Sequence, residues 1–137
     1  SRLRWIDMAQ AYGVAHLVYF DDPRSAGKEM LDWIDSMDIL LVPSKTEGMP
    51  RVLLEGLSRA SVIVGSSVGD IPYLLDANEV VDKHDWQTLA RRVSELLDNK
   101  SLMIEIARTN FSIAQSFQIQ NLSDKRNNFI KGIPKDA

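Results

Sequence analysis

The chain contains 137 residues, of which 45% are hydrophobic and 26% charged, a composition typical of one globular domain and not of a disordered or fibrous segment. Its formal net charge is −3 with both signs mixed along the chain, so no basic stripe indicates a nucleic-acid partner. The lack of cysteine excludes disulfides and thiolate chemistry, and the lack of a signal-peptide pattern or bilayer-length apolar run leads us to expect a soluble, cytoplasmic protein.

The first segment carries a helical signal and then a strand signal. Residues 3–12 have the apolar spacing of an amphipathic helix, and Gly13 is suited to end it. "HLVYF" at 16–20 is a short run of β-branched and aromatic residues, followed by the turn signal "DDP". We therefore predict a helix over 3–12 and a strand over 16–20.

The centre of the chain predicts alternating helices and strands. Helical spacing over 26–37 leads to the unbroken apolar run 38–43, which is typical of a strand covered on both faces of a parallel sheet. A helix from about 51 to 60 leads to a strand at 62–67, a brief helical turn and a last short strand at 78–81. The gaps between strands fit crossover helices and are too long for hairpins, so we predict a βαβ array.

The last third predicts helices only. Asp85 is suited to be the N-cap of a helix with a long apolar stripe, and a second stripe follows the "DNKS" break. A third helical piece is predicted through Leu122 and Phe129. Three tryptophans lie on helical stripes and are predicted to be core anchors: Trp5, Trp33 and Trp86.

The predicted fold class is α/β, a parallel sheet with flanking helices and a helical C-terminal tail. One domain is expected over residues 1–137, with the sheet region at 14–82 and the helical tail at 85–131. Neither His16 nor His84 has a partner at metal-ligand spacing, so both are expected to be structural or exposed.

The segment "PSKTEGMPR" is the loop between a predicted strand and the next helix. Ligands of open α/β sheets bind at the carboxyl ends of the strands. Gly48 lets the backbone approach a ligand closely, and Pro50 suits the first helical position. The amides of Arg51 and Val52 would then lie at a helix N-terminus, which favours an anion such as a phosphate.

Two carboxylates flank this phosphate site. Glu55 lies about 7–8 Å along the helix axis from Pro50, a span that the ribose of a nucleoside diphosphate covers, and vicinal hydroxyls supply the donors that a carboxylate accepts. Glu47 lies on the other side, where a second sugar would project. Spacing alone favours a different interpretation, in which Arg51, Glu55 and Arg59 form ordinary surface ion pairs.

The string "DILLVPSKTEGMPRVLLEGLSRASVIVGSSVGDIP" resembles the nucleotide-binding, Rossmann-like C-terminal domain of retaining glycosyltransferases with the GT-B fold (group 1 type). That family has a strand ending in Pro-Ser, then Glu-Gly, a second Glu eight positions after the first, a Val-rich strand and a Gly-x-Pro turn. The corresponding elements here are Pro43 and Ser44, Glu47 and Gly48, Glu55, Val62 to Val64, and Gly69 to Pro72. The likeness covers nearly the whole chain.

The resemblance implies the later portion of a donor domain that transfers a hexose from a nucleotide-diphosphate sugar to an acceptor, with retention. The implied site residues are Glu47 as the catalytic residue and Gly48, Met49, Pro50, Arg51, Val52 and Glu55 as donor-binding residues. Glu47 would meet the transferred sugar, the Arg51 and Val52 amides the distal phosphate, and Glu55 the ribose. No metal or other cofactor is implied, because backbone dipoles and basic side chains neutralise the leaving diphosphate.

The resemblance also implies parts that this sequence lacks. The family's diphosphate-gripping Arg and Lys, and its N-terminal acceptor domain, precede the first helix found here. In the family strand order 3-2-1-4-5-6, the strands at 16–20 and 38–43 would flank two absent strands and leave a hole in the sheet. We therefore expect a fragment that is inactive alone and needs the acceptor domain of the same enzyme. Two further hypotheses are a strand-exchanged dimer and peripheral membrane association of the longer protein.

Four positions depart from the family pattern: Ala60, Val62, Asp70 and Tyr73, where Gly, Pro, Gly and Glu are usual. They leave open a catalytically silent module that binds a nucleotide sugar or a protein partner. A third alternative is a receiver-like signalling domain with Mg²⁺ on Asp21 and Asp22, although the later strand ends in Pro43 where a receiver has an acid.

Overall fold

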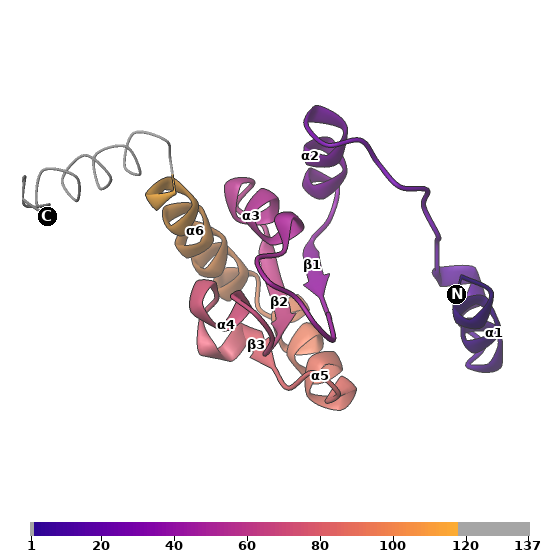
Figure 1. Cartoon of the computed structure of the whole chain (residues 1–137). Coiled ribbons are helices and arrows are strands. Elements are labelled where there is room, and N and C mark those ends of the chain that lie inside the picture. The colour runs from indigo at the N-terminus through magenta and orange to yellow at the C-terminus, as the bar shows by residue number, and fades with distance from the viewer. Residues whose placement is uncertain (1, 118–137) are drawn as a thin grey trace, which may run out of the picture.

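Three short parallel strands form the centre of the molecule, whose computed structural model describes residues 2–117 (Figure 1). The strands are β1 (Ile39–Val42), β2 (Val62–Ser66) and β3 (Val80–Val81), and they lie side by side in that order. Ile39 of β1 lies opposite Val62, and Gly65 of β2 lies opposite Val80. All three carboxyl ends therefore meet at one edge of the sheet.

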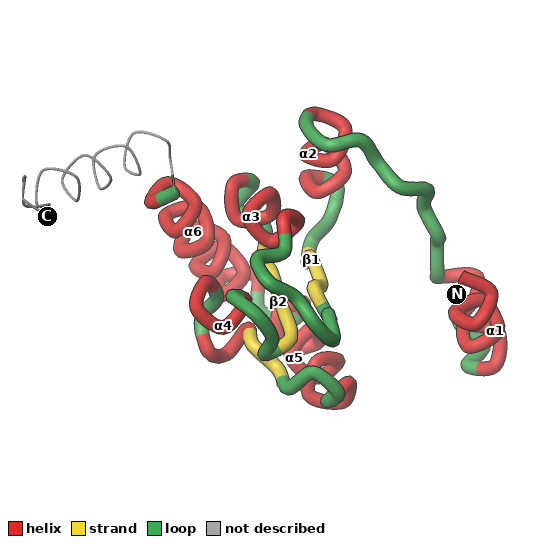
Figure 2. Tube along the Cα trace, in the orientation of Figure 1, coloured by secondary structure: helices red, strands yellow, loops and turns green. Residues whose placement is uncertain are grey.

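Helices connect and follow the strands, as Figure 2 shows. Between the strands run α3 (Arg51–Ser58), then α4 (Ile71–Leu74) with the short 3₁₀ turn η2 (Ala77–Glu79). The C-terminal part is α5 (Trp86–Leu97) and α6 (Lys100–Ser116). The predicted α/β class and helical C-terminal segment are confirmed, while the helical piece predicted through Leu122 and Phe129 lies outside the described residues.

The two faces of the sheet build two hydrophobic cores, because neighbouring residues of a strand point to opposite sides. On one face, Leu40 and Ile63 pack against α3 and α4; on the other, Val62 and Val64 pack against α5 and α6. Helix α3 lies very close to the sheet at Gly56, where a Cβ atom would be 2.7 Å from the Leu40 side chain. A glycine at this position therefore allows α3 to pack closely on β1 and β2.

The N-terminal segment lies apart from the sheet (Figure 1). Helix α1 (Arg2–Ala11) ends one residue before the predicted boundary and is followed by the predicted Gly13, which has a φ of +70°. A 3₁₀ turn, η1 (Ala15–Leu17), and an irregular segment then lead to α2 (Lys28–Asp35). No helix among residues 2–117 is both long and apolar enough to cross a membrane.

The strand predicted over 16–20 is wrong. Its first two residues belong to η1 and the others have no regular structure, with Leu17 and Tyr19 strongly exposed. A strand needs a neighbour to hydrogen-bond with, and within the described residues this segment has none. The described sheet therefore ends at β1, and the predicted hole between two strands is not found in it.

Two of the three tryptophans are not core anchors. Trp5 is 55% exposed on α1, and Trp86 is 50% exposed at the first residue of α5. Trp33 is partly buried, and its indole nitrogen donates a 2.9 Å hydrogen bond to Asp21. His16 and His84 are both exposed, in agreement with the prediction.

Candidate functional site

The loop at residues 43–50 leaves the carboxyl end of β1 and enters α3. Pro50 was expected at the first helical position, but it is the N-cap, with an extended ψ of 122°, and Arg51 is the first helical residue. The prediction is one residue off because the carbonyl of Pro50 already accepts the first helical bond, from the Leu53 amide at 3.1 Å. A proline offers no side-chain cap, so the first amides of α3 stay open.

A row of backbone amides in and after this loop is free. Within residues 2–117, no acceptor bonds the N–H groups of Gly48, Met49, Arg51 and Val52. Arg51 and Val52 are at the N-terminus of α3, where the helix dipole favours negative charge. The arrangement can therefore bind an anion through backbone donors.

The turn between β2 and α4 contacts the backbone of the loop at 43–50. The Asp70 amide donates a 3.0 Å hydrogen bond to the carbonyl oxygen of Gly48. Gly69 has a φ of +53°, and a Cβ there would lie 2.3 Å from that same oxygen and 2.5 Å from the carbonyl oxygen of Glu47. The carbonyl of Gly48 and the N–H of Met49 belong to the same trans peptide bond and therefore point in opposite directions. Since the turn binds the Gly48 oxygen, the Met49 N–H points away from the turn.

The two carboxylates differ in their surroundings. Glu47 is exposed on the loop and accepts a 2.7 Å hydrogen bond from the hydroxyl of Ser44. Glu55 is on α3 with a side chain only 17% exposed, and one of its oxygens accepts a 3.0 Å bond from Arg51. The predicted ion pair of Glu55 with Arg51 is therefore present. The predicted pair of Glu55 with Arg59 is not formed, because Arg59 pairs with Asp35 of α2.

Residues that follow β2 and β3 also lie at the carboxyl edge of the sheet and form a hollow there. Five of them line an open hollow of about 600 Å³: Ser67, Asp82, Lys83, His84 and Asp85. Sequence reasoning had given Lys83 and His84 no role at the site. The signal that could have found them is their position directly after a strand of a parallel sheet. Among residues 2–117, no group of three His, Asp or Glu side chains could hold a metal ion.

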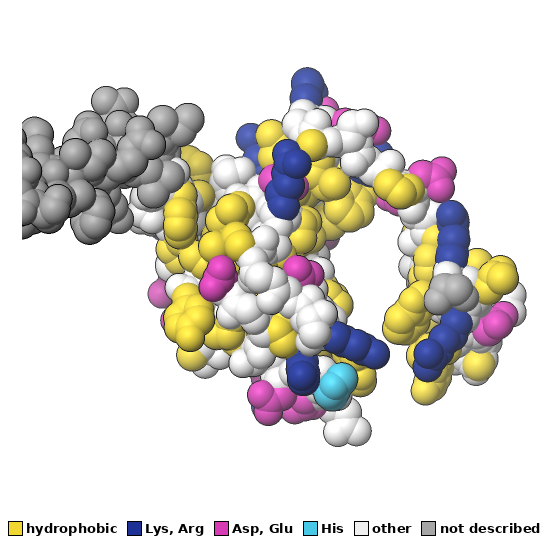
Figure 3. Space-filling model, in the orientation of Figure 1, with side chains coloured by type: hydrophobic (Ala, Val, Ile, Leu, Met, Phe, Trp, Pro, Cys, Tyr) yellow, Lys and Arg dark blue, Asp and Glu magenta, His cyan; other side chains and the backbone are white. Residues whose placement is uncertain are grey.

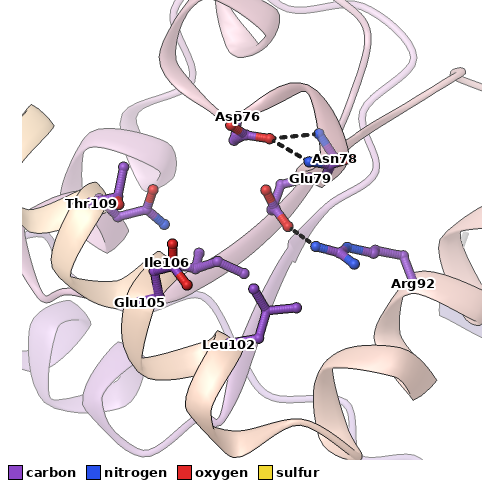
Figure 4. A pocket seen from close by; sticks show the side chains of 9 residues that line it. Asp76, Asn78, Glu79, Arg92, Leu102, Glu105, Ile106 and Thr109 are labelled. Carbon is purple, nitrogen blue, oxygen red and sulfur yellow. Dashed lines mark hydrogen bonds and ion pairs between the residues drawn. The ribbon is translucent and has the colours of Figure 1, made fainter.

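A second polar cavity, of about 140 Å³, lies near the amino ends of β2 and β3, between η2, α5 and α6 (Figure 4). In it the buried Glu79 forms an ion pair with Arg92, and Asn110 donates a 2.8 Å bond to the Ser61 carbonyl. These groups tie helices to the sheet. We interpret the cavity as structural, because its two most buried polar side chains are bonded to the protein itself.

The receiver-like arrangement is not formed. Asp21 accepts hydrogen bonds from Arg24 and Trp33, and Asp22 is 3.4 Å from Arg2. Neither acid follows a strand, so the two carboxylates do not lie at the edge where a receiver binds Mg²⁺.

Solved structures share this fold. Sucrose-phosphate synthase from Thermosynechococcus elongatus superposes with a TM-score of 0.80 at 18% identity, over 95% of this chain and 33% of its own. The C-terminal domain of a group 1 glycosyl transferase (LpcC) from Francisella tularensis gives a TM-score of 0.76 at 18% identity, over 85% of this chain and 61% of that domain. At this identity the likeness establishes the fold alone.

Sequence comparison adds the family. A D-inositol 3-phosphate glycosyltransferase from Corynebacterium diphtheriae is 31% identical over 98 residues, which are 69% of this chain and 23% of the relative. One from Streptomyces coelicolor is 28% identical over 114 residues, 80% of this chain and 24% of the relative. The chain thus spans about a quarter of these curated relatives. The family model described as glycosyl transferases group 1 matches residues 2–99, and the chain belongs to that family.

Proposed function

We propose that this chain is the nucleotide-sugar-binding part of a glycosyltransferase that moves a hexose from a nucleotide-diphosphate donor to an acceptor, with retention. Family membership supports glycosyl transfer. The observation that carries the donor site is the set of free amides of Gly48, Met49, Arg51 and Val52 at the carboxyl edge of the sheet, with Glu47 before them and Glu55 after them in the chain.

Each part of the donor has a counterpart in this proposal. The distal phosphate accepts hydrogen bonds from the Arg51 and Val52 amides, and backbone dipoles offset its charge without a metal or other cofactor. Glu55 accepts from the ribose hydroxyls with the oxygen that Arg51 leaves unbonded. Glu47 acts on the transferred sugar, with Gly48 and Met49 presenting backbone to it.

The acceptor side belongs to the rest of the proposed enzyme. Because the chain spans about a quarter of its curated relatives, we propose that acceptor binding needs an additional domain. We expect the isolated chain to give no sugar transfer in a coupled nucleotide-release assay, and turnover by the chain alone would contradict this. Cytoplasmic location, a strand-exchanged dimer and peripheral membrane association stay proposals about the longer protein.

Calorimetric titration of the 137-residue chain with UDP, GDP and ADP tests the donor site. We expect Glu55→Gln to weaken binding of the preferred nucleotide about tenfold, because a neutral amide replaces the charged acceptor of the ribose hydroxyls. Glu105→Gln is the matched control and should bind like wild type, because this exposed glutamate of α6 lines the other polar cavity and not the candidate donor site. Equal affinity of wild type and Glu55→Gln would show that Glu55 is only the partner of an ion pair.

A catalytically silent module is the second candidate. It is favoured by Tyr73, which stands where the family usually has Glu and whose side chain, 85% exposed, supplies no carboxylate. Such a module would bind a nucleotide sugar but release no nucleotide, even with an acceptor domain attached.

A further inference from the structure

The Glu47 side chain has one restraint in the structure, and Ser44 provides it. Ser44 is half-buried two residues after β1, and its hydroxyl donates the 2.7 Å bond to Oε1 of Glu47. Within residues 2–117, no Lys, Arg or His forms an ion pair with Glu47 and no other side chain bonds it. Without this bond an exposed glutamate would sample several rotamers.

The backbone of Glu47 is held separately. Its carbonyl oxygen lies against Gly69, and the next carbonyl, of Gly48, accepts the bond from the Asp70 amide. The turn thus fixes the position of the Glu47 backbone, and the Ser44 hydroxyl fixes the position of its carboxylate. One carboxylate oxygen, Oε2, is left without a partner among the described residues.

We propose that Ser44 is a positioning residue, which holds the Glu47 carboxylate so that its free oxygen accepts a hydrogen bond from a hydroxyl of the transferred sugar. This inference rests on the proposed function of the site. It assigns to Ser44 an effect on the sugar half of the donor alone, because the hydroxyl lies on the Glu47 side of the loop and does not bond the amides at the start of α3.

The test compares the preferred nucleoside diphosphate with its glucose conjugate, both titrated into the 137-residue chain by calorimetry. We expect Ser44→Ala to weaken binding of the glucose conjugate about tenfold and to leave the affinity for the nucleoside diphosphate unchanged. Ser44→Thr keeps the hydroxyl and should restore most of the loss. Ser112→Ala, an exposed serine of α6, is the control and should change neither affinity.

A double variant separates positioning from loop stability. If Ser44 acts through Glu47, Ser44→Ala combined with Glu47→Gln should bind the glucose conjugate no more weakly than Glu47→Gln alone. Equal losses for both ligands in Ser44→Ala would overturn the proposal, since they would indicate a general loop defect. So would a wild-type affinity for the glucose conjugate in that variant.

The outcome also separates this inference from the proposed function. If the chain binds a nucleoside diphosphate in a Glu55-dependent way but Ser44→Ala has no effect, only the role of Ser44 fails. If wild type binds neither ligand, the donor site fails and the role of Ser44 fails with it.

Discussion

Gly69 lies in close contact with the backbone of the loop after β1. Its positive φ and its contact with two carbonyl oxygens leave no room for a side chain. We expect Gly69→Ala to lower the free energy of unfolding by at least about 2 kcal/mol, because the left-handed backbone strains alanine and the new methyl group meets rigid backbone. Urea denaturation measures this.

Gly48→Ala is the control for that experiment. A Cβ at Gly48 meets nothing within 4 Å, and its φ is not in the left-handed region. Its stability should stay within about 0.5 kcal/mol of wild type. If Gly69→Ala were equally harmless, the loop and the turn would not be in the close contact described here.

The ion pair between Glu79 and Arg92 is the most buried one among the described residues, with side chains 3% and 16% exposed. Replacing Glu79 by Leu leaves the Arg92 charge without its buried partner, so we expect a loss of about 3–5 kcal/mol in urea denaturation. The more exposed partner of Arg92 is Glu95, at 3.2 Å, and Glu95→Ala should cost less than about 1 kcal/mol.

Removing both charges completes the test. The double variant Glu79→Leu with Arg92→Leu should be more stable than Glu79→Leu alone, since no uncompensated charge stays buried. A double variant less stable than the single one would mean that the arginine contributes through its other contacts and not through the pair.

At the scale of elements, helix α5 depends on a cap that titrates. The Asp85 side chain accepts from the Thr88 amide at 2.9 Å, and hydrogen bonds from Thr88 lower the pKa of this carboxyl below its usual 3.8. A lowered pKa in the folded state adds stability above the unfolded-state pKa, which is lost as the pH falls through the folded-state value. We therefore expect Asp85→Ala to be destabilised at pH 7 and the difference from wild type to shrink below pH 4.

Helix α6 provides the uncharged comparison. Its N-cap, Asn99, accepts from the Leu102 amide at 3.0 Å. Asn99→Ala should cost about 1 kcal/mol, and because an amide does not titrate, its difference from wild type should stay constant between pH 7 and pH 3. Thermal denaturation across this range checks both variants. A difference for Asp85→Ala that does not change with pH would contradict the role of its charge.

Elements with strong local signals could be predicted from the sequence. The apolar runs of β1 and β2, the apolar face of α3 and the Asp85 cap all depend on residues close in the chain, and the structure confirms these elements. The prediction that β1 is covered on both faces is wrong, because β1 is an edge strand of the described sheet and its Leu41 is 42% exposed. The segment 16–20 has the composition of a strand, but pairing is a long-range property that composition does not carry. For the same reason, the exposure of Trp5 could not be read from its helical spacing.

The candidate site was predictable in part. The loop at 43–50 with its Glu47, and Glu55 on the helix after it, follow from a strand, a Gly and a Pro in order. The bond from Ser44 to Glu47 and the support of Gly48 by Asp70 could not be predicted, because the first depends on loop geometry and the second joins residues far apart in the chain. The buried Glu79 was missed since an acid beside a short strand gives no sign of its distant partner, Arg92.

At the scale of the whole molecule, the two ends of the sheet have different roles. At the amino ends, Glu79 and Asn110 bind α5 and α6 to the sheet through buried polar contacts. At the carboxyl ends, the loop at 43–50 leaves backbone donors unbonded and two carboxylates in reach. Stabilising contacts at one end leave the other end free to bind a ligand, so variants at Glu79 should change stability far more than nucleotide affinity.

The N-terminal segment should be dispensable for this core. Helix α1 buries only Ala9, and its exposed apolar residues include Leu3 and Trp5. Figure 3 shows hydrophobic side chains on the surface of the separate N-terminal lobe. Both hydrophobic cores consist of residues from Met37 onward. We therefore expect a chain lacking residues 1–17 to keep its fold and to bind the preferred nucleoside diphosphate within about twofold of wild type.

Hydrogen exchange on the whole chain tests the same point without a deletion. Amides of α1 should exchange much faster than those of β2, because few buried contacts oppose local opening of that helix. The truncated chain should retain the far-ultraviolet circular dichroism and the cooperative urea transition of the core. Slow exchange in α1, or loss of cooperative unfolding on truncation, would show that the N-terminal segment packs on the core in solution.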